Sequence, residues 1–172
     1  DSRPGIFEGR ARQWRAKVFI LGAQHGRHHR IRGRRQIEAV RRAGLDERVR
    51  ILQGDVAIAV PQASFDVVVM VEVLHEIAPQ IRPSVVQACA RALRPGGWIV
   101  IVDETYPATL AEARQEAFRF PLQTGLEELM WGNVVPTRAE QESLLRAAGF
   151  DGPIERSQFG EGFTLLVSKY AG

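Results

Sequence analysis

The stretch that decides the fold runs from Val49 to Glu104. It reads VRILQGDV, then SFDVVVMVEVLHEI, then, after a helical run, ALRPGGWIVIVDE. It contains three short runs rich in Val and Ile, at Val49–Leu52, Val67–Val71 and Trp98–Val102. Each run is apolar at nearly every position rather than at every second one, which predicts parallel strands covered on both faces. The stretch therefore predicts an α/β fold.

Each of these runs is followed by acidic residues. Asp55 follows the first, Glu72 the second, and Asp103 and Glu104 the third. In an open parallel sheet, ligands bind outside the carboxyl ends of the strands. An acid there can also simply solvate a loop or cap a helix, but acids after three strands in register indicate a binding site.

Size and composition describe an ordinary globular domain. The chain has 172 residues and a net charge of +3, and it has no apolar run near the length of a membrane span. Its single cysteine, Cys89, excludes disulfides within the chain and cysteine-based zinc sites. We expect Cys89 to be a buried small residue on a helix rather than a nucleophile. No signal peptide is visible, and a reducing, cytoplasmic setting fits.

The rest of the chain continues the alternation of strands and helices, and we expect a single domain over 1–172. Predicted strands lie at Lys17–Leu21, Ile154–Phe159 and Phe163–Lys169, and predicted helices at Arg34–Ala43, from about Pro83 to Leu93, and after the capping box that begins at Thr137. The last two strands should form an antiparallel pair at the sheet edge. The segment 105–136 is predicted to be a helical insertion, with a break at Pro121.

From about Ala43 to Lys169 the chain resembles class I S-adenosylmethionine-dependent methyltransferases of the small-molecule branch. The resemblance rests on AGLDERVRILQGDV, FDVVVMVEVLHEI, ARALRPGGWIVIVDE, TRAEQESLLRAAGF and FTLLVSKY, which follow one another in the family's order. It implies a Rossmann-like fold with a mostly parallel sheet and helices on both faces. It also implies S-adenosylmethionine as cofactor and a small-molecule methyl acceptor. A homodimer is a candidate assembly, and no membrane association is expected.

The resemblance also implies roles for individual residues. Asp55 would accept a hydrogen bond from the adenine amino group, with Val56 packing on the base, while Val71 and Glu72 would face the methionine portion. His75 would lie near the entry of the methyl acceptor. The residues implied on the substrate side are Asp103, Glu104, Tyr106, Phe120 and Trp131. Aromatic residues at helical spacing are also common in protein cores, so Trp131 is a candidate both for the acceptor pocket and for the protein core.

The N-terminal part departs from the family pattern. The family's first strand ends in an acid and a Gly-x-Gly-x-Gly turn, and its second strand ends in an acid that binds the ribose. Here only KVFIL precedes Arg34. As the first strand it would supply Gly22 and Gly26 to the cofactor; as the second it lacks the ribose acid, and the first strand is absent. Either alignment leaves the N-terminal part incomplete.

His75 is the candidate catalytic residue. A hydroxyl acceptor must lose a proton, and the ordinary pKa of histidine suits a general base near neutral pH. The alternative is that His75 only forms hydrogen bonds within its own loop. No metal site is expected, because Asp103 and Glu104 are adjacent on a strand and point to opposite faces.

Two other functions stay open at this point. One is a non-catalytic module with the methyltransferase fold that serves interaction or dimerisation. The other is a nucleic-acid methyltransferase or binder, because residues 25–35 hold five arginines and three histidines, with Arg27–Arg35 as the basic segment. That segment has no interleaved aromatic residues for base stacking, which makes a nucleic-acid partner the less favoured reading.

Overall fold

The computed structural model describes residues 19–21, 35, 37–160 and 162–172. The chain divides into two compact units, residues 1–55 and residues 56–172. Gly22, Gly26 and nearly all of the basic segment Arg27–Arg35 lie outside the described residues, so their predicted roles stay predictions. Among the described residues, no helix has the length and apolar character needed to span a membrane.

The first unit contains a two-stranded parallel sheet. Strand β1 (Phe19–Leu21) pairs with β2 (Leu52–Gly54), and Phe19 lies opposite Leu52. In the doubly wound order 3-2-1-4-5-6, the strand beside the third strand is the second. The pairing therefore favours reading KVFIL as the second strand of the family rather than the first. The predicted strand at Val49–Leu52 is shifted towards the carboxyl end, because β2 begins only at Leu52.

A helix through residues 37–42 precedes β2 and ends where the sequence predicts. The amide of Gly44 donates to Arg41 O at 2.9 Å, and the amide of Leu45 donates to Val40 O at 3.0 Å. Gly44 has a φ of +64°, the left-handed conformation that this pattern of bonds requires and that glycine adopts at little cost.

The second unit is built on a four-stranded mixed sheet in the order β3-β4-β6-β5. Strand β3 (Phe65–Val71) is parallel to β4 (Leu93–Glu104), whereas β6 (Phe163–Lys169) is antiparallel to both β4 and β5 (Ile154–Phe159). The predicted antiparallel pair at the sheet edge is confirmed at the predicted residues. The predicted fold class, a Rossmann-like α/β fold, is also confirmed.

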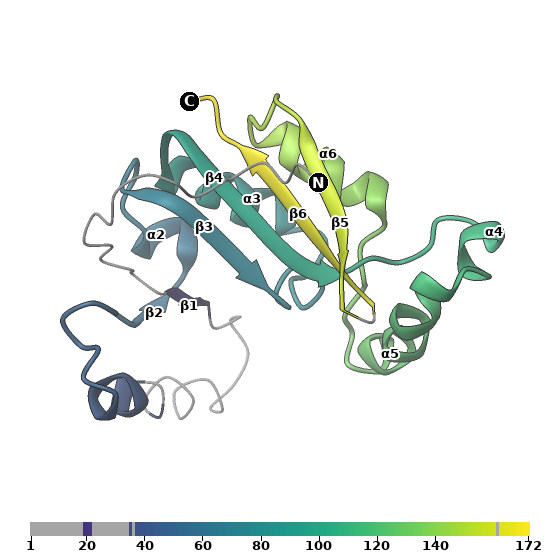
Figure 1. Cartoon of the computed structure of the whole chain (residues 1–172), viewed down its shortest axis with the longest axis horizontal. Helices are drawn as coiled ribbons and strands as arrows, with labels where there is room; N and C mark the ends of the chain where they lie inside the picture. The colour runs from purple at the N-terminus through teal and green to yellow at the C-terminus, as the bar shows by residue number, and fades with distance from the viewer. Residues whose placement is uncertain (1–18, 22–34, 36, 161) are drawn as a thin grey trace, which may run out of the picture. The chain divides into compact units, whose positions relative to one another are not determined.

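Two helices, α3 (Arg82–Ala92) and α6 (Arg138–Ala147), lie behind this sheet in Figure 1. Helix α3 has Pro83 in its first turn, where a missing N–H costs nothing. Helix α6 begins with the predicted capping box: Thr137 Oγ1 accepts from the amide of Glu140, whose carboxylate accepts from the amide of Thr137. The core on this side contains Met70, Val86, Ile99, Ile101, Leu145, Phe150 and Leu166.

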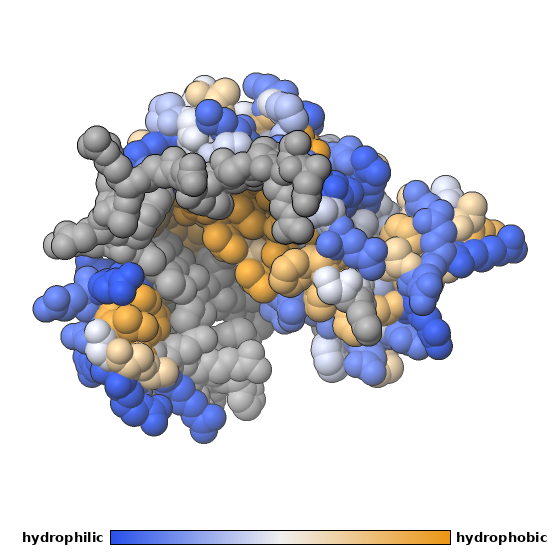
Figure 2. Space-filling model, in the orientation of Figure 1, coloured by the Kyte–Doolittle hydropathy of each residue, from blue (hydrophilic) through white to orange (hydrophobic). Residues whose placement is uncertain are grey.

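The opposite face of β3 is exposed. Val67, Val69 and Val71 are 40%, 57% and 53% exposed, and Figure 2 shows apolar side chains over β3 and β4. Cys89, by contrast, is buried on α3, and burial raises the pKa of its thiol to about 11. A thiol of this kind is inert at neutral pH, which agrees with the expectation that it is a packing residue.

The segment between β4 and α6 is helical, as predicted, and its assignment as an insertion stays a prediction. It contains α4 (Leu110–Ala113), a short 3-10 turn η1 (Glu116–Phe118) and α5 (Arg119–Met130). The predicted break at Pro121 is wrong, because Pro121 lies in the first turn of α5, where proline is tolerated. The remaining short helix, α2 (Val56–Ala59), follows β2 directly. The predicted single domain stays a prediction.

Candidate active site

The site begins at a sharp turn after β3. The next residue, Glu72, has a φ of +51°, a left-handed conformation that is rare for residues other than glycine. Its amide still donates to Val102 O on β4 at 2.8 Å, so the turn starts at the carboxyl end of the sheet. Strained backbone of this kind is often found at functional sites. The turn leads into the loop that carries His75.

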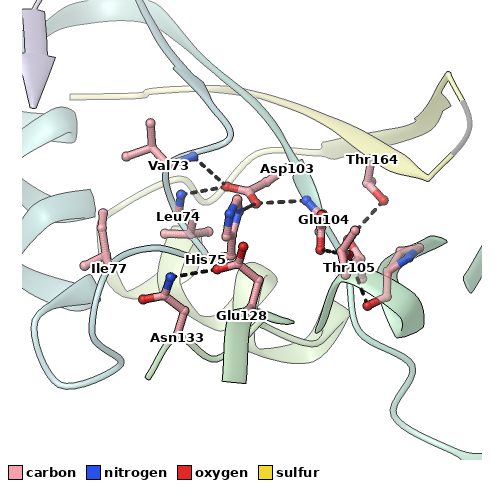
Figure 3. A network of polar contacts seen from close by, with 12 residues as sticks. Val73, Leu74, His75, Ile77, Asp103, Glu104, Thr105, Glu128, Asn133 and Thr164 are labelled. Carbon is pink, nitrogen blue, oxygen red and sulfur yellow. Dashed lines mark hydrogen bonds and ion pairs between the residues drawn. The ribbon is translucent and has the colours of Figure 1, made fainter. Parts of the chain in front are cut away.

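Asp103, near the end of β4, holds this loop in place (Figure 3). Its Oδ2 accepts hydrogen bonds from the amides of Val73 at 3.2 Å and Leu74 at 2.6 Å. Its Oδ1 accepts one from the amide of Glu104 at 2.8 Å and lies 2.5 Å from His75 Nδ1. The carboxylate is fully buried. The bonds with Val73, Leu74 and His75 fix the loop and the imidazole relative to the strand.

The imidazole of His75 is also buried, with 6% of the residue exposed. Burial lowers its pKa, but the hydrogen bond that the ring donates to Asp103 and the negative charges of Asp103, Glu104 and Glu128 raise it, and the net shift is upward. An ionised carboxylate only accepts hydrogen bonds, so in the neutral ring Nδ1 carries the hydrogen and Nε2 the lone pair. Within the described part of the chain Nε2 has no hydrogen-bond partner. The arrangement leaves Nε2 able to accept a proton.

Two further carboxylates lie near the imidazole. Glu104 is 5% exposed, and burial raises its pKa against the opposing effects of a hydrogen bond from Thr124 and the proximity of His75. The Thr124 hydroxyl donates to Glu104 Oε2 at 2.8 Å, which connects β4 to α5. Glu128, also on α5, accepts from Asn133 Nδ2 at 2.7 Å. No set of three His, Cys, Asp or Glu side chains among the described residues is arranged to bind a metal ion.

The structure brings together only some of the residues predicted from the sequence. His75 and Glu104 lie in one polar network, and Val71 and Glu72 are exposed where β3 ends. Asp55 is exposed after β2, and Val56 is buried at the start of α2.

The aromatic residues of the insertion have separate environments. Tyr106 is half-buried against Gly125 of α5, and Phe120 packs on Phe163 with ring centroids 5.5 Å apart. Trp131, just after α5, is 69% exposed.

Sequence reasoning missed the partners of His75. Asp103 was expected only at the border of the substrate side, although a histidine after one strand and an acid at the end of the neighbouring parallel strand already placed both at the same edge. Thr124 and Glu128 carry no such signal, because α5 belongs to an insertion whose position does not follow from strand order. The alternative, in which His75 forms hydrogen bonds only within its own loop, is wrong, since the hydrogen-bond partner of its ring lies on β4.

Comparison with known proteins identifies the fold. A model described as "Methyltransferase domain" matches residues 32–101. No curated protein matches the chain. The structure of the S-adenosylmethionine-dependent methyltransferase SibL in its apo form is similar over 91% of this chain and 44% of that one, with 20% identity and a TM-score of 0.66.

Two other solved structures are also similar. The mitomycin 7-O-methyltransferase MmcR is matched over 89% of this chain and 41% of that one, with 20% identity and a TM-score of 0.68. Human N-acetylserotonin methyltransferase in complex with SAM is matched over 73% of this chain and 35% of that one, with 19% identity and a TM-score of 0.58. The chain thus spans less than half the length of these proteins.

Proposed function

We propose that this chain, which has the class I methyltransferase fold, transfers a methyl group from S-adenosylmethionine to a hydroxyl group of a small molecule, with His75 as the general base. The observation that carries the proposal is the contact between His75 and Asp103 at the carboxyl end of the sheet, where ligands of such folds bind. The small-molecule methyltransferases among the similar structures support the same reaction class.

The residues at the end of β3 fit the cofactor. Val71 is 53% exposed and Glu72 is exposed, so both side chains are available to the methionine portion that the resemblance assigns to them. By the same resemblance Asp55 would accept a hydrogen bond from the adenine amino group, with Val56 packing on the base. When bound, S-adenosylmethionine supplies an electrophilic methyl group on a sulfonium. The task left to the chain is to orient the acceptor, exclude water and remove a proton.

His75 suits the removal of that proton. Nε2 would accept the proton of the acceptor hydroxyl as the oxygen attacks the methyl group, which gives an imidazolium. The carboxylate of Asp103 stabilises this cation and prevents the ring from turning. The raised pKa of His75 makes it a stronger base than a free imidazole, provided the pH is high enough to keep the ring neutral.

The acceptor would lie beside the insertion. Glu104 faces the imidazole and is joined to α5, and Tyr106 and Trp131 are the aromatic candidates for contact with a flat or apolar molecule. Tyr106 is already in contact with α5, whereas most of Trp131 is exposed and free to cover a ligand.

The first test concerns the cofactor. Calorimetric titration with S-adenosylhomocysteine should show micromolar binding by the native chain and none by Asp55→Ala. Asp46→Ala, which removes another exposed acid from the same unit, is the matched control and should bind as the native chain does. A folded chain that fails to bind millimolar ligand would instead support a non-catalytic module with this fold.

The second test concerns the base. A panel of simple phenols and catechols with radiolabelled S-adenosylmethionine would identify an acceptor that is turned over. His75→Ala should then lower turnover by about a hundredfold or more, the contribution typical of a positioned base, and leave S-adenosylhomocysteine binding intact. Unchanged turnover in this variant would rule out His75 as the base.

A further inference from the structure

Arg82, the first residue of α3, has an unusual environment for an arginine. Only 3% of it is exposed. Its Nε donates to Ile77 O at 2.8 Å, and its Nη2 donates to His75 O at 3.3 Å and to Val134 O. The guanidinium therefore binds backbone carbonyls from two segments that are far apart in the sequence.

Helix formation does not account for an arginine at this position. A cation at a helix N-terminus opposes the helix dipole, and burial lowers the pKa of Arg82 against the favourable charges of Glu140 and Asp103. Within the described part of the chain, Arg82 forms no ion pair with a carboxylate. A buried cation is costly unless its hydrogen bonds are satisfied. The free energy that offsets this cost must come from the hydrogen bonds that Arg82 donates to backbone carbonyls.

Those carbonyls belong to the two segments that border the imidazole. His75 and Ile77 are in the loop that carries the proposed base, and Val134 is in the segment after α5. Helix α5 provides Thr124, bonded to Glu104, and Glu128, whose charge acts on His75. Arg82 thus connects the loop of the base to the end of the insertion that would contact the acceptor.

We propose that Arg82 is a positioning residue for methyl transfer: it holds the His75 loop against the segment after α5, so that the imidazole keeps its contact with Asp103 and its place near Glu104 and Glu128. The consequence for the reaction rests on the proposed function of His75. The structural part, which is that Arg82 maintains the environment of the imidazole, can be tested without any acceptor.

The test measures the titration of His75 by proton NMR in the native chain and in Arg82→Met, with His75→Gln used to assign the signal. The groups that set this titration are Asp103 and Glu104 on β4 and Glu128 on α5. If Arg82 positions the ring, its loss weakens the contact with Asp103 and the pKa of His75 falls. Removal of a nearby positive charge alone would raise it. The two explanations therefore predict shifts of opposite sign.

Arg146→Met is the matched control. Arg146 also donates to two backbone carbonyls, those of Phe150 and Gly152, but on α6 and at an exposed position. The Arg146→Met substitution should leave the pKa of His75 unchanged. Should Arg82→Met fail to fold by far-UV circular dichroism, Arg82→Lys keeps the charge but not the planar fork of donors, and the pKa of His75 should fall there too.

Kinetics complete the test. Arg82→Lys should lower turnover about tenfold or more through misplacement of the base, with S-adenosylhomocysteine binding unchanged. An unchanged or raised pKa of His75 in the folded variants would overturn the proposal, whatever the activity. If instead that pKa falls but His75→Gln turns over normally, the positioning by Arg82 stands and the proposed function of His75 fails.

Discussion

Nδ1 of His75 lies 2.5 Å from Oδ1 of Asp103, and this contact joins residues 28 positions apart in the sequence. His75 follows β3 and Asp103 lies near the end of β4, so the parallel pairing of these strands sets the distance between the two side chains. The orientation of the proposed base thus depends on a carboxylate fixed in the sheet rather than on its own loop.

The first prediction concerns Asp103→Asn. An amide cannot accept hydrogen bonds at both of its terminal atoms, so it cannot replace a carboxylate that accepts from Val73, Leu74, Glu104 and His75. We expect the free energy of unfolding to fall by about 2 kcal/mol, as for the loss of a hydrogen bond to a charged group. The pKa of His75 should fall as well. Urea denaturation and NMR titration measure the two effects.

Asp66→Asn is the control for that experiment. Asp66 pairs with Arg94 at 2.8 Å, but both side chains are more than half exposed. Exposed pairs of this kind contribute about 1 kcal/mol or less. A stability loss as large as that of Asp103→Asn, or a shift in the His75 titration, would contradict the role given to Asp103.

The second prediction concerns pH. The pKa of His75 is raised in the folded chain, so its protonation stabilises the fold: this contribution is complete below the unfolded value of about 6.5 and disappears as the pH rises through the folded value. The rate follows the opposite course, because kcat/KM should rise as the base loses its proton. We expect the midpoint of that rise above pH 6.5. The change in stability should be absent in His75→Gln, and a midpoint below 6.5 would contradict the assignment.

The sequence predicted those parts of the fold that depend on local patterns. The Val- and Ile-rich runs at Val67–Val71 and Trp98–Val102, the capping box at Thr137 and the glycine at 44 each determine a strand or a helix end through nearby residues alone, and the structure has them as predicted. The run at Val49–Leu52 was placed too early, since β2 begins only at Leu52. The helix after Arg119 was placed less well, since Pro121 was read as a break. A proline stops a helix in its interior but fits its first turn, and the sequence does not show where the preceding turn begins.

The candidate site, like the fold, could be predicted from the sequence only in part. His75 and Glu104 could be placed at one edge because both follow parallel strands, and no knowledge of side-chain contacts was needed. Arg82 could not be recognised, since its partners are backbone carbonyls, which every residue carries and no sequence pattern marks. The sequence also does not predict the contacts that α5 makes with the site. The path of an insertion is decided by packing such as that of Tyr106 on Gly125.

The third prediction concerns the capping box of α6. Thr137→Ala removes the side chain that accepts from the amide of Glu140 and should reduce the free energy of unfolding by about 1 kcal/mol. The pKa of Glu140 is lowered by hydrogen bonds from the backbone and side chain of Thr137, so it should rise in the variant. Thr109→Ala, at the start of the short exposed helix α4, is the control. An equal decrease in the free energy of unfolding of both variants would contradict a specific role for the capping box.

The fourth prediction concerns Gly125 in the middle of α5. Alanine in a helix interior is normally about 1 kcal/mol more favourable than glycine, yet a Cβ at this position would lie 2.4 Å from Cε2 of Tyr106. That distance is far below van der Waals contact, so either the ring or the helix must move. We therefore expect Gly125→Ala to destabilise the chain in urea denaturation, against the trend of helix propensity.

A double-mutant cycle separates the two effects of that substitution. In a Tyr106→Ala background the ring is gone, so Gly125→Ala should there increase the free energy of unfolding by about 1 kcal/mol. The sign of the effect is expected to reverse between the two backgrounds. If Gly125→Ala changes stability equally with and without the tyrosine ring, then Tyr106 does not pack on α5 as the structure has it, and its place beside the proposed acceptor site is lost with that contact.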